Sequence, residues 1–356
     1  MSKVALITNI SGQDGSYLTE LLLKKGYTVH GIILHSPVPD TEFVTDDLHA
    51  NNPDFHIHHY GWGEILDLRS LLALIRPDEI YNLDITSETT AHSTFPVTGI
   101  SALRMLEAIR SEGLERTTRY YHASSSALSG LVNGMTINEM VTFNLPPSET
   151  VARVSDFWTA VNYRETFGMY ACNGILFNHE SPRRSESFVT RKITRGLANI
   201  TQGLEKCLYL GNLNALRDWG HARDYVKMQW LMLQQDKPED FVIATGVQFT
   251  VRQFVTFAAL ELGIKLRFVG KGVEEKGVIA AIISPVAAAL KVGDVIVAVD
   301  PRYMRPSEVS KVSVNPSKAR RQLGWAPETS LQDLVIEMVQ ADLAFAKKAA
   351  RLKLYG

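Results

Sequence analysis

The sequence predicts an α/β fold built on a doubly wound parallel sheet, and three observations support this prediction. Short apolar runs alternate with amphipathic stretches through the first half of the chain, as strands joined by crossover helices do. A glycine-containing turn directly follows the first apolar run, Val4–Ile7. The chain has 356 residues and is 45% hydrophobic, which is enough for a large core and a second, smaller domain.

The elements of the first half are expected in the order strand, helix, strand. The first helix should cover Gly15–Lys25, because apolar side chains recur there at helical spacing and Gly26 is suited to cap its end. Further strands are expected at Tyr27–Leu34, Phe55–His58, Glu79–Leu83, Arg119–Ala123 and Cys172–Phe177, with helices at Leu68–Ile75 and Thr150–Phe167.

The pattern loosens after Asn178, where helical segments alternate with short strand pairs. This change predicts two domains: residues 1–177 carry the parallel sheet, and residues 178–356 form mainly a second domain with segments able to return to the sheet. Helices are expected at Phe188–Gln202, Asp224–Gln234, Val251–Leu262 and Leu331–Lys348, and a strand near Asp294–Val299.

Composition excludes several classes of function. The formal net charge is −1 and no basic run could neutralise a phosphate backbone, so we expect no nucleic-acid partner. No apolar stretch reaches the length of a membrane span, and the first residues run into a strand, so a cytoplasmic location is expected. Cys172 and Cys207 are too few for a metal cage or a disulfide framework, and we expect no metal site.

The segment Thr8–Gly15 occupies the place of a dinucleotide-binding turn. Such a turn uses glycines to bend, to let the backbone approach a pyrophosphate, and to pack the helix against the strand. Gly12 and Gly15 could fill the second and third roles, whereas Asn9 stands in the first. The segment is either a degraded dinucleotide turn or a structural turn. Leu34–Ser36, at the end of the second strand, contains nothing that would select NAD or NADP.

Two further segments lie where catalytic groups are expected. Glu149 and Arg153 are four residues apart on one helix face, which most simply gives a salt bridge. They cannot replace a Tyr-x-x-x-Lys pair, because glutamate is ionised at neutral pH and arginine does not release its proton. Ser124–Ser126 could donate to a sugar hydroxyl or serve as turn residues.

Cations beside aromatic residues are concentrated in the second half of the chain. Each group alone would be an ordinary surface feature, but together they predict an anion-binding site suited to a diphosphate. These groups are Asn178–Arg184, Phe188–Ile193, Arg217–Gly220 and Arg302–Glu308.

The chain resembles the GDP-mannose 4,6-dehydratase family of extended short-chain dehydrogenases/reductases, from Met1 to about Lys348. The most specific matches are Val161–Glu165, Asn178–Arg195, Leu216–Gly220 and Leu323–Trp325. The resemblance implies a Rossmann domain followed by a nucleotide-sugar domain. It also implies tightly held NADP, oxidation of mannose C4, loss of water across C5 and C6, and return of hydride to C6.

The same resemblance shows departures on the cofactor side. The family's three turn glycines correspond to Asn9, Gly12 and Gly15, its arginine pair to Leu34 and His35, and its Asp-Leu to Trp62-Gly63. We therefore expect NADP binding to be weak or absent. The cofactor positions that remain are Gly12, Gln13, Asp14, Gly15, His179 and Arg184.

Most of the family's catalytic positions are also changed. Ser125 keeps a hydroxyl where the family has threonine, whereas Ala127 replaces the glutamate that takes the C5 proton. Glu149 and Arg153 replace the tyrosine and lysine. Residues expected between Pro96 and Leu103 are missing, which predicts a shorter helix beside the site.

The positions that hold GDP and the sugar in the family are kept: Asn178, Val189, Lys192, Arg217, Arg305 and Glu308. We therefore expect a protein that binds GDP-mannose or GDP and is inactive or severely impaired in catalysis. One alternative is a working dehydratase, or a related sugar-nucleotide enzyme, that uses substitute residues. Another is a scaffold or regulatory subunit of an active paralogue. The family's assembly surfaces imply a homo-oligomer, dimer or tetramer, or a hetero-oligomer with that paralogue.

Overall fold

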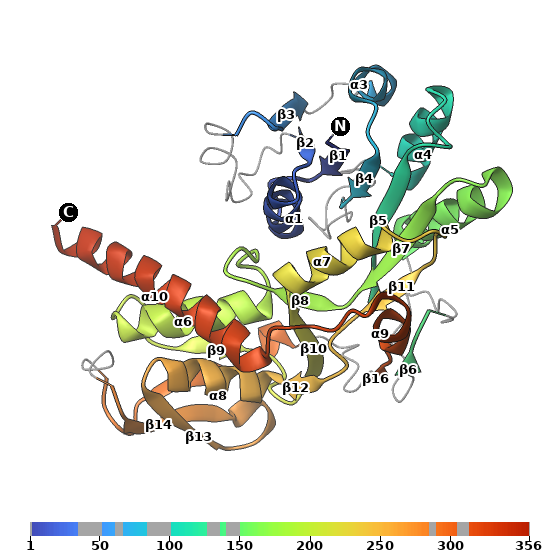
Figure 1. The fold of residues 1–356 in the computed structure, drawn as a ribbon. Coiled ribbons are helices and arrows are strands. Elements are labelled where there is room, and N and C mark those ends of the chain that lie inside the picture. The colour runs from blue at the N-terminus through green and yellow to red at the C-terminus, as the bar shows by residue number, and fades with distance from the viewer. Residues whose placement is uncertain are drawn as a thin grey trace.

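A computed structural model describes residues 2–34, 52–60, 67–83, 101–126, 136–139, 150–284, 290–304 and 313–355. Its central feature is a seven-stranded sheet in the order β11-β7-β5-β4-β1-β2-β3 (Figure 1). All neighbouring strands are parallel. The strands are β1 (Val4–Thr8), β2 (Thr28–Leu34), β3 (Phe55–Tyr60), β4 (Glu79–Asn82), β5 (Arg119–Ser125), β7 (Ala171–Leu176) and β11 (Phe241–Ile243).

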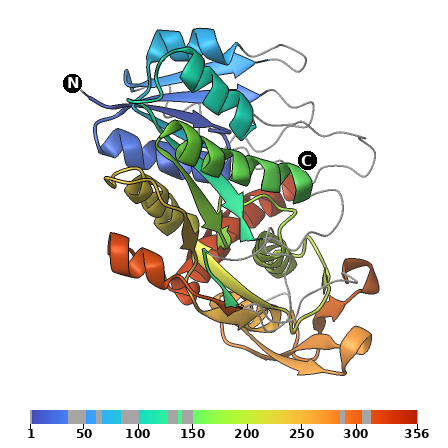
Figure 2. The same cartoon turned by 90° about the vertical axis from the view of Figure 1, so that its right-hand side faces the viewer.

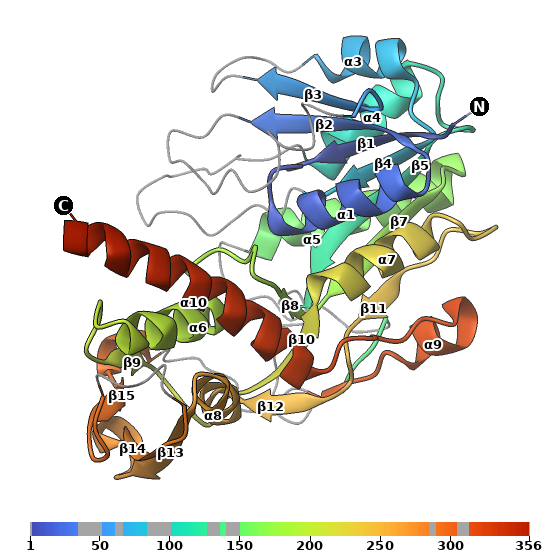
Figure 3. The same cartoon turned by 60° about the vertical axis from the view of Figure 1, so that its left-hand side comes forward.

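Helices cover both faces of this sheet. Alternate residues of a strand point to opposite faces, so Ala5 and Ile7 of β1 pack in one cluster and Leu6 in another. The first cluster contains α1 (Gln13–Lys24) and α7 (Ala222–Met232), which lie side by side in Figure 3. The second contains α3 (Leu68–Ile75), α4 (Ala102–Ser111) and α5 (Thr150–Phe167). With β1 inside the sheet and both faces covered, the predicted doubly wound fold is confirmed.

The second half of the chain has a core of its own. It is formed by α6 (Val189–Thr201), α8 (Val251–Glu261) and α10 (Leu331–Tyr355) against a sheet in the order β13-β14-β15-β9. The orange strands of this sheet lie at the end of the molecule farthest from the blue strands (Figure 2). The strands of the whole sheet are β13 (Ile264–Val269), β14 (Lys276–Ile282), β15 (Val295–Val299) and β9 (Leu208–Leu210), of which the first three are orange.

Short strands connect the two halves. β8 (Asn178–Glu180), β10 (Leu216–His221) and β12 (Gln248–Thr250) form a three-stranded sheet, and β6 (Thr136–Ile137) pairs with β16 (Ser313–Val314). β7 ends at Leu176, whereas β11 and α7 bring later residues back to the large sheet. Among the described residues, no helix is long and apolar enough to cross a membrane.

Several element boundaries differ from those predicted. α1 begins at Gln13 rather than Gly15, because Gly12 is its N-cap. α7 begins at Ala222 rather than Asp224, because the His221 side chain accepts a hydrogen bond from the Arg223 amide and caps the helix. α10 continues to Tyr355 rather than ending near Lys348. Two helices of the structure, α4 and α9 (Ser317–Leu323), were not predicted.

Candidate functional site

The turn between β1 and α1 has the backbone of a dinucleotide-binding turn. Asn9 adopts a left-handed conformation with φ of 49°, which asparagine tolerates better than most residues. The Gly12 amide donates to the Asn9 carbonyl oxygen at 3.0 Å. A Cβ on Gly15 would lie 2.5 Å from that same oxygen, so Gly15 is required for α1 to pack against the strand. The turn therefore survives the loss of its first glycine.

The side chain of Asn9 changes what this turn can accept. A Cβ on Gly12 would lie 3.0 Å from Asn9 Nδ2 and 3.2 Å from Asn9 Cγ. The amide group of Asn9 thus lies beside Gly12, on the side where a Cβ would project.

Asp14 and His179 form the centre of a polar cluster beside this turn. His179 Nε2 lies 2.9 Å from both carboxylate oxygens of Asp14, and Nδ1 lies 2.8 Å from the Phe177 carbonyl oxygen. Burial alone would raise the pKa of Asp14, but the His179 ring, together with the Arg184 guanidinium and the Gln13 amide, outweighs burial and holds that pKa below its usual value. The Tyr225 ring stacks on His179 with centroids 4.6 Å apart. Both ring nitrogens of His179 are therefore engaged within the protein.

Amide side chains extend the cluster across three elements. Gln13 Nε2 donates to the His179 carbonyl oxygen at 3.0 Å, and Gln13 Oε1 accepts from the Ser181 hydroxyl at 2.7 Å. Gln229 Nε2 donates to Asp14 at 3.0 Å. The predicted cofactor residues Gln13, Asp14 and His179 thus join α1 to β8 and α7. Gln229 was not predicted as a site residue, because it gains this role only when α7 meets α1.

The two arginines that follow β8 contact protein groups. Arg184, a predicted cofactor residue, lies 3.3 Å from the Glu180 carboxylate, and its guanidinium is 3.5 Å from the Phe188 ring centre. Arg183 forms an ion pair with Glu20 and lies over the Tyr17 ring at 4.1 Å. Arg183 therefore packs against α1, whereas the ion pair and ring contact of Arg184 are with residues of its own segment, Glu180 and Phe188.

The described catalytic positions lie at the ends of β5 and α5. Ser125 is the last residue of β5 and is half-buried, whereas the neighbouring Ser124 is buried. Arg153 lies near the start of α5 and is half-buried. Ala127 and Glu149 lie outside the described residues, as do His35 and Trp62-Gly63. The expected Glu149–Arg153 salt bridge therefore stays a prediction.

The described substrate positions lie on neighbouring elements of the second half. Asn178 begins β8 and is in register with Trp219 of β10, the strand that also carries Arg217. Val189 begins α6, and Lys192 lies on the first turn of that helix. All four are half-buried. Arg305 and Glu308 lie outside the described residues.

Lys192 contacts the segment that leads to Arg305. Its ammonium lies 3.2 Å from the centre of the Tyr303 ring, and Tyr303 is half exposed. A cation held on an accessible aromatic ring is suited to bind an anionic group beside a planar one. This contact brings two of the groups predicted for the diphosphate site together, because Lys192 belongs to Phe188–Ile193 and Tyr303 belongs to Arg302–Glu308.

Three other members of the predicted anion site are used elsewhere. Trp219 is 3% exposed and packs edge-on against Phe254 in the core, so it is no platform for a base. Arg191 is buried in an ion pair with Asp342 of α10. Arg302 pairs with Asp300 on the surface.

Comparisons with known proteins assign the chain to a family. A family model described as GDP-mannose 4,6 dehydratase matches residues 6–338. A curated GDP-mannose 4,6-dehydratase from Vibrio cholerae is 54% identical, with 100% of this chain and 98% of the relative covered. One from Yersinia enterocolitica is 53% identical, with 99% and 97% covered.

Solved structures share the fold at low sequence identity. A dTDP-glucose 4,6-dehydratase from Bacillus anthracis in complex with NAD has a TM-score of 0.73 and 16% identity, covering 98% of this chain and 100% of that one. A UDP-glucuronic acid 4-epimerase from Bacillus cereus in complex with NAD has a TM-score of 0.72 and 19% identity, covering 96% and 99%.

Proposed function

Because the chain belongs to the GDP-mannose 4,6-dehydratase family, we propose that it binds GDP-mannose or GDP but has lost most or all dehydratase activity. This proposal is supported by three positions, Ala127, Glu149 and Arg153, which by resemblance stand where the family has proton-transferring groups, in a chain that is 54% identical to a curated dehydratase. Ala127 cannot accept the C5 proton, and Glu149 and Arg153 cannot act as the phenol and ammonium of the family pair. Ser125 alone keeps a comparable group.

The expected loss of reaction rate can be estimated from the missing acid and base groups. General acid and base groups each supply roughly 10²–10⁴-fold in rate. Losing three of them together would remove most of the acceleration that an enzyme of this kind needs. The remaining hydroxyl of Ser125 can position a sugar oxygen, but a serine hydroxyl is no substitute for the glutamate and tyrosine of the family.

We also propose that NADP binds weakly or not at all. The Asn9 side chain lies beside Gly12 of the turn, and Asp14 and His179 bind each other. Leu34 and His35 stand where an arginine pair would contact a 2′-phosphate, and each missing charge-assisted hydrogen bond costs about 1.5–3 kcal/mol.

Binding of the GDP-sugar is assigned to the second half of the chain. In this proposal Lys192, Arg217 and Arg305 contact the diphosphate, and Asn178 orients the ligand by hydrogen bonding. Val189 and Glu308 complete the site. The support for this assignment is the resemblance at all six positions and the Lys192–Tyr303 contact.

A second function, full dehydratase activity with substitute residues, is favoured by the high identity to curated dehydratases over the whole chain. A role as a scaffold subunit, alone or with an active paralogue, draws support from exposed apolar side chains. Leu103 on α4 and Trp158 on α5 are 52% and 53% exposed. Because exposed apolar side chains favour association, we also propose that the protein is an oligomer. We propose separately that it is located in the cytoplasm.

Turnover of GDP-mannose tests the main proposal against the second function. The full chain is incubated with GDP-mannose and NADP, and GDP-4-keto-6-deoxymannose is measured by chromatography and mass spectrometry. We expect no product, and none from the E149Y/R153K double variant, because the cofactor site would still be closed. Product from the unmodified chain, purified free of host enzyme, would establish the second function instead.

A further inference from the structure

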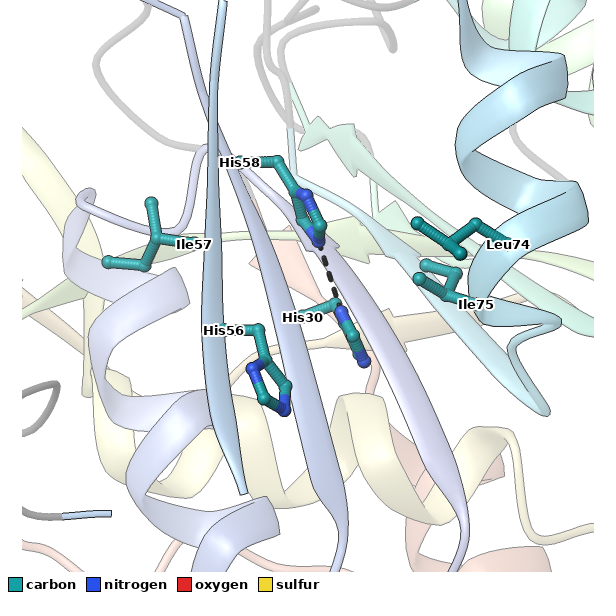
Figure 4. Close-up of a pocket in the computed structure, with 6 residues that line it drawn as sticks. All are labelled: His30, His56, Ile57, His58, Leu74 and Ile75. Carbon is teal, nitrogen blue, oxygen red and sulfur yellow. Dashed lines mark hydrogen bonds between the residues drawn. The ribbon is translucent and has the colours of Figure 1, made fainter. Parts of the chain in front are cut away.

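Three histidine side chains gather on one face of the large sheet, outside the site described above. His30 of β2 is in register with His56 of β3, and Ile32 is in register with His58. Because alternate strand residues share a face, all three rings lie on the α3 side. They line an open hollow of about 510 Å³ with Ile57, Leu74 and Ile75 (Figure 4).

Two of the rings point directly at each other. His30 Nδ1 lies 3.0 Å from His58 Nε2, the contact drawn as a dashed line in Figure 4. The ring centroids are 5.3 Å apart and the planes differ by only 13°, so the rings meet end to end. His56 stacks on His30 with centroids 4.7 Å apart. One nitrogen of His30 and one of His58 therefore face each other at hydrogen-bond distance, and the His56 ring stacks on His30 beside them.

Two of the rings, His30 and His58, favour the neutral form, which is the form that binds metals. Burial lowers the pKa of His30 to about 4, with a smaller effect from the neighbouring His56 and His58. The pKa of His58 is also lowered by burial and by His56 and His59. A neutral imidazole carries a free electron pair on one nitrogen, and zinc, nickel and copper accept such ligands.

We propose that His30 and His58 bind one divalent first-row transition-metal ion, such as Zn²⁺ or Ni²⁺, in place of their shared hydrogen. Two imidazole nitrogens that each lie ~2.0–2.1 Å from one ion are about 3 Å from each other. The facing nitrogen that carries the hydrogen of this bond would give it up while the other nitrogen of the same ring takes one from solvent, so that both facing nitrogens have a free electron pair. Both rings would also turn out of their end-to-end alignment to aim these pairs at the ion.

The site would leave coordination positions open. Within the described part of the chain, no three histidine, cysteine or carboxylate side chains are already arranged to hold a metal. Water, or the His56 ring after rotation, would fill the remaining positions. The proposal does not depend on the proposed function, because no predicted catalytic, cofactor or substrate residue takes part.

Metal titration of the full chain tests this inference. After treatment with EDTA and dialysis, ZnCl₂ and NiCl₂ are titrated into the wild-type protein by calorimetry. We expect one ion per chain with a Kd in the micromolar range, and no competition from excess Mg²⁺, which prefers oxygen ligands. The variants H30Q and H58Q should bind at least about 10-fold more weakly.

The matched control is H59Q, because His59 is exposed and belongs to the opposite face of β3. It should bind as tightly as the wild type. Circular dichroism verifies that each variant folds. The paramagnetic resonance spectrum of Cu²⁺ bound to the wild type gives a test that needs no variant, because nitrogen coupling is expected. A wild-type Kd above about 1 mM, equal affinity of H30Q and H58Q with the wild type, or a spectrum without nitrogen coupling would overturn the proposal.

Discussion

His122 should make the stability of this fold depend on pH. The ring lies on β5 and is 4% exposed, and among the described residues its Nδ1 has no hydrogen-bond partner. Burial lowers the pKa of His122 to about 4, from 6.5 in an unfolded chain. Each pKa unit corresponds to 1.36 kcal/mol, so His122 contributes up to about 3 kcal/mol.

The sign follows from which state binds the proton. Between pH 6.5 and about pH 4 the unfolded chain is protonated at this position and the folded chain is not. The free energy of unfolding therefore contains a contribution that is complete above pH 6.5 and is lost as the pH falls. Between pH 7.5 and pH 4.5 the expected loss from His122 alone is about 2.5 kcal/mol.

Urea unfolding of the wild type and of His122→Gln at several pH values isolates this contribution, since the other groups titrate in both proteins. The difference in free energy of unfolding should change by about 2.5 kcal/mol in favour of the variant as the pH falls to 4.5. His59→Gln, which removes an exposed ring, serves as the control. A His122→Gln difference that stays constant across this range would refute the reasoning.

Three further predictions concern the packing and the ligand site. Arg191→Met leaves the Asp342 carboxylate buried without its cation, so the free energy of unfolding in urea should fall by about 3–5 kcal/mol. The double variant Arg191→Met/Asp342→Leu should recover much of this loss, because no buried charge remains. Equal stability of the single and double variants would contradict this reasoning. Gly15→Ala places a Cβ 2.5 Å from the Asn9 carbonyl oxygen, so a loss of about 1–3 kcal/mol is expected by the same measurement, and an unchanged midpoint would show that the turn adapts freely. Lys192→Met should weaken GDP binding in calorimetry by at least about 10-fold, because a charge-assisted contact is lost. Lys265→Met, at an exposed position on β13, should leave GDP binding unchanged.

Long periodic segments of this chain could be predicted from the sequence, whereas short strands could not. The helices at Leu68–Ile75 and Thr150–Phe167 have the expected bounds, because apolar side chains recur over two or more turns. β8 and β12 have three residues each, which are too few to show alternation. α4 was predictable: Ser101 is its N-cap, and buried residues recur along it at helical spacing.

In the candidate site, too, features that depend on neighbouring residues could be predicted, whereas contacts between residues far apart in the sequence could not. The sequence located the turn at Asn9 and the changed catalytic positions, because each departs from a family motif. It could not show that Arg191 is neutralised by Asp342, which lies 151 residues away. The His-x-His spacing of His56 and His58 predicts two rings on one strand face, but His30 joins them only through β2–β3 pairing.

The central claim is that the ligand site for a GDP-sugar remains while the cofactor site is lost, and non-denaturing mass spectrometry tests both parts together. The full chain is mixed with equal amounts of NADP and GDP-mannose at concentrations well above the micromolar range. We expect a mass increase that corresponds to GDP-mannose and none that corresponds to NADP, in line with the proposed function. A bound NADP, or a protein that takes up neither molecule, would contradict it.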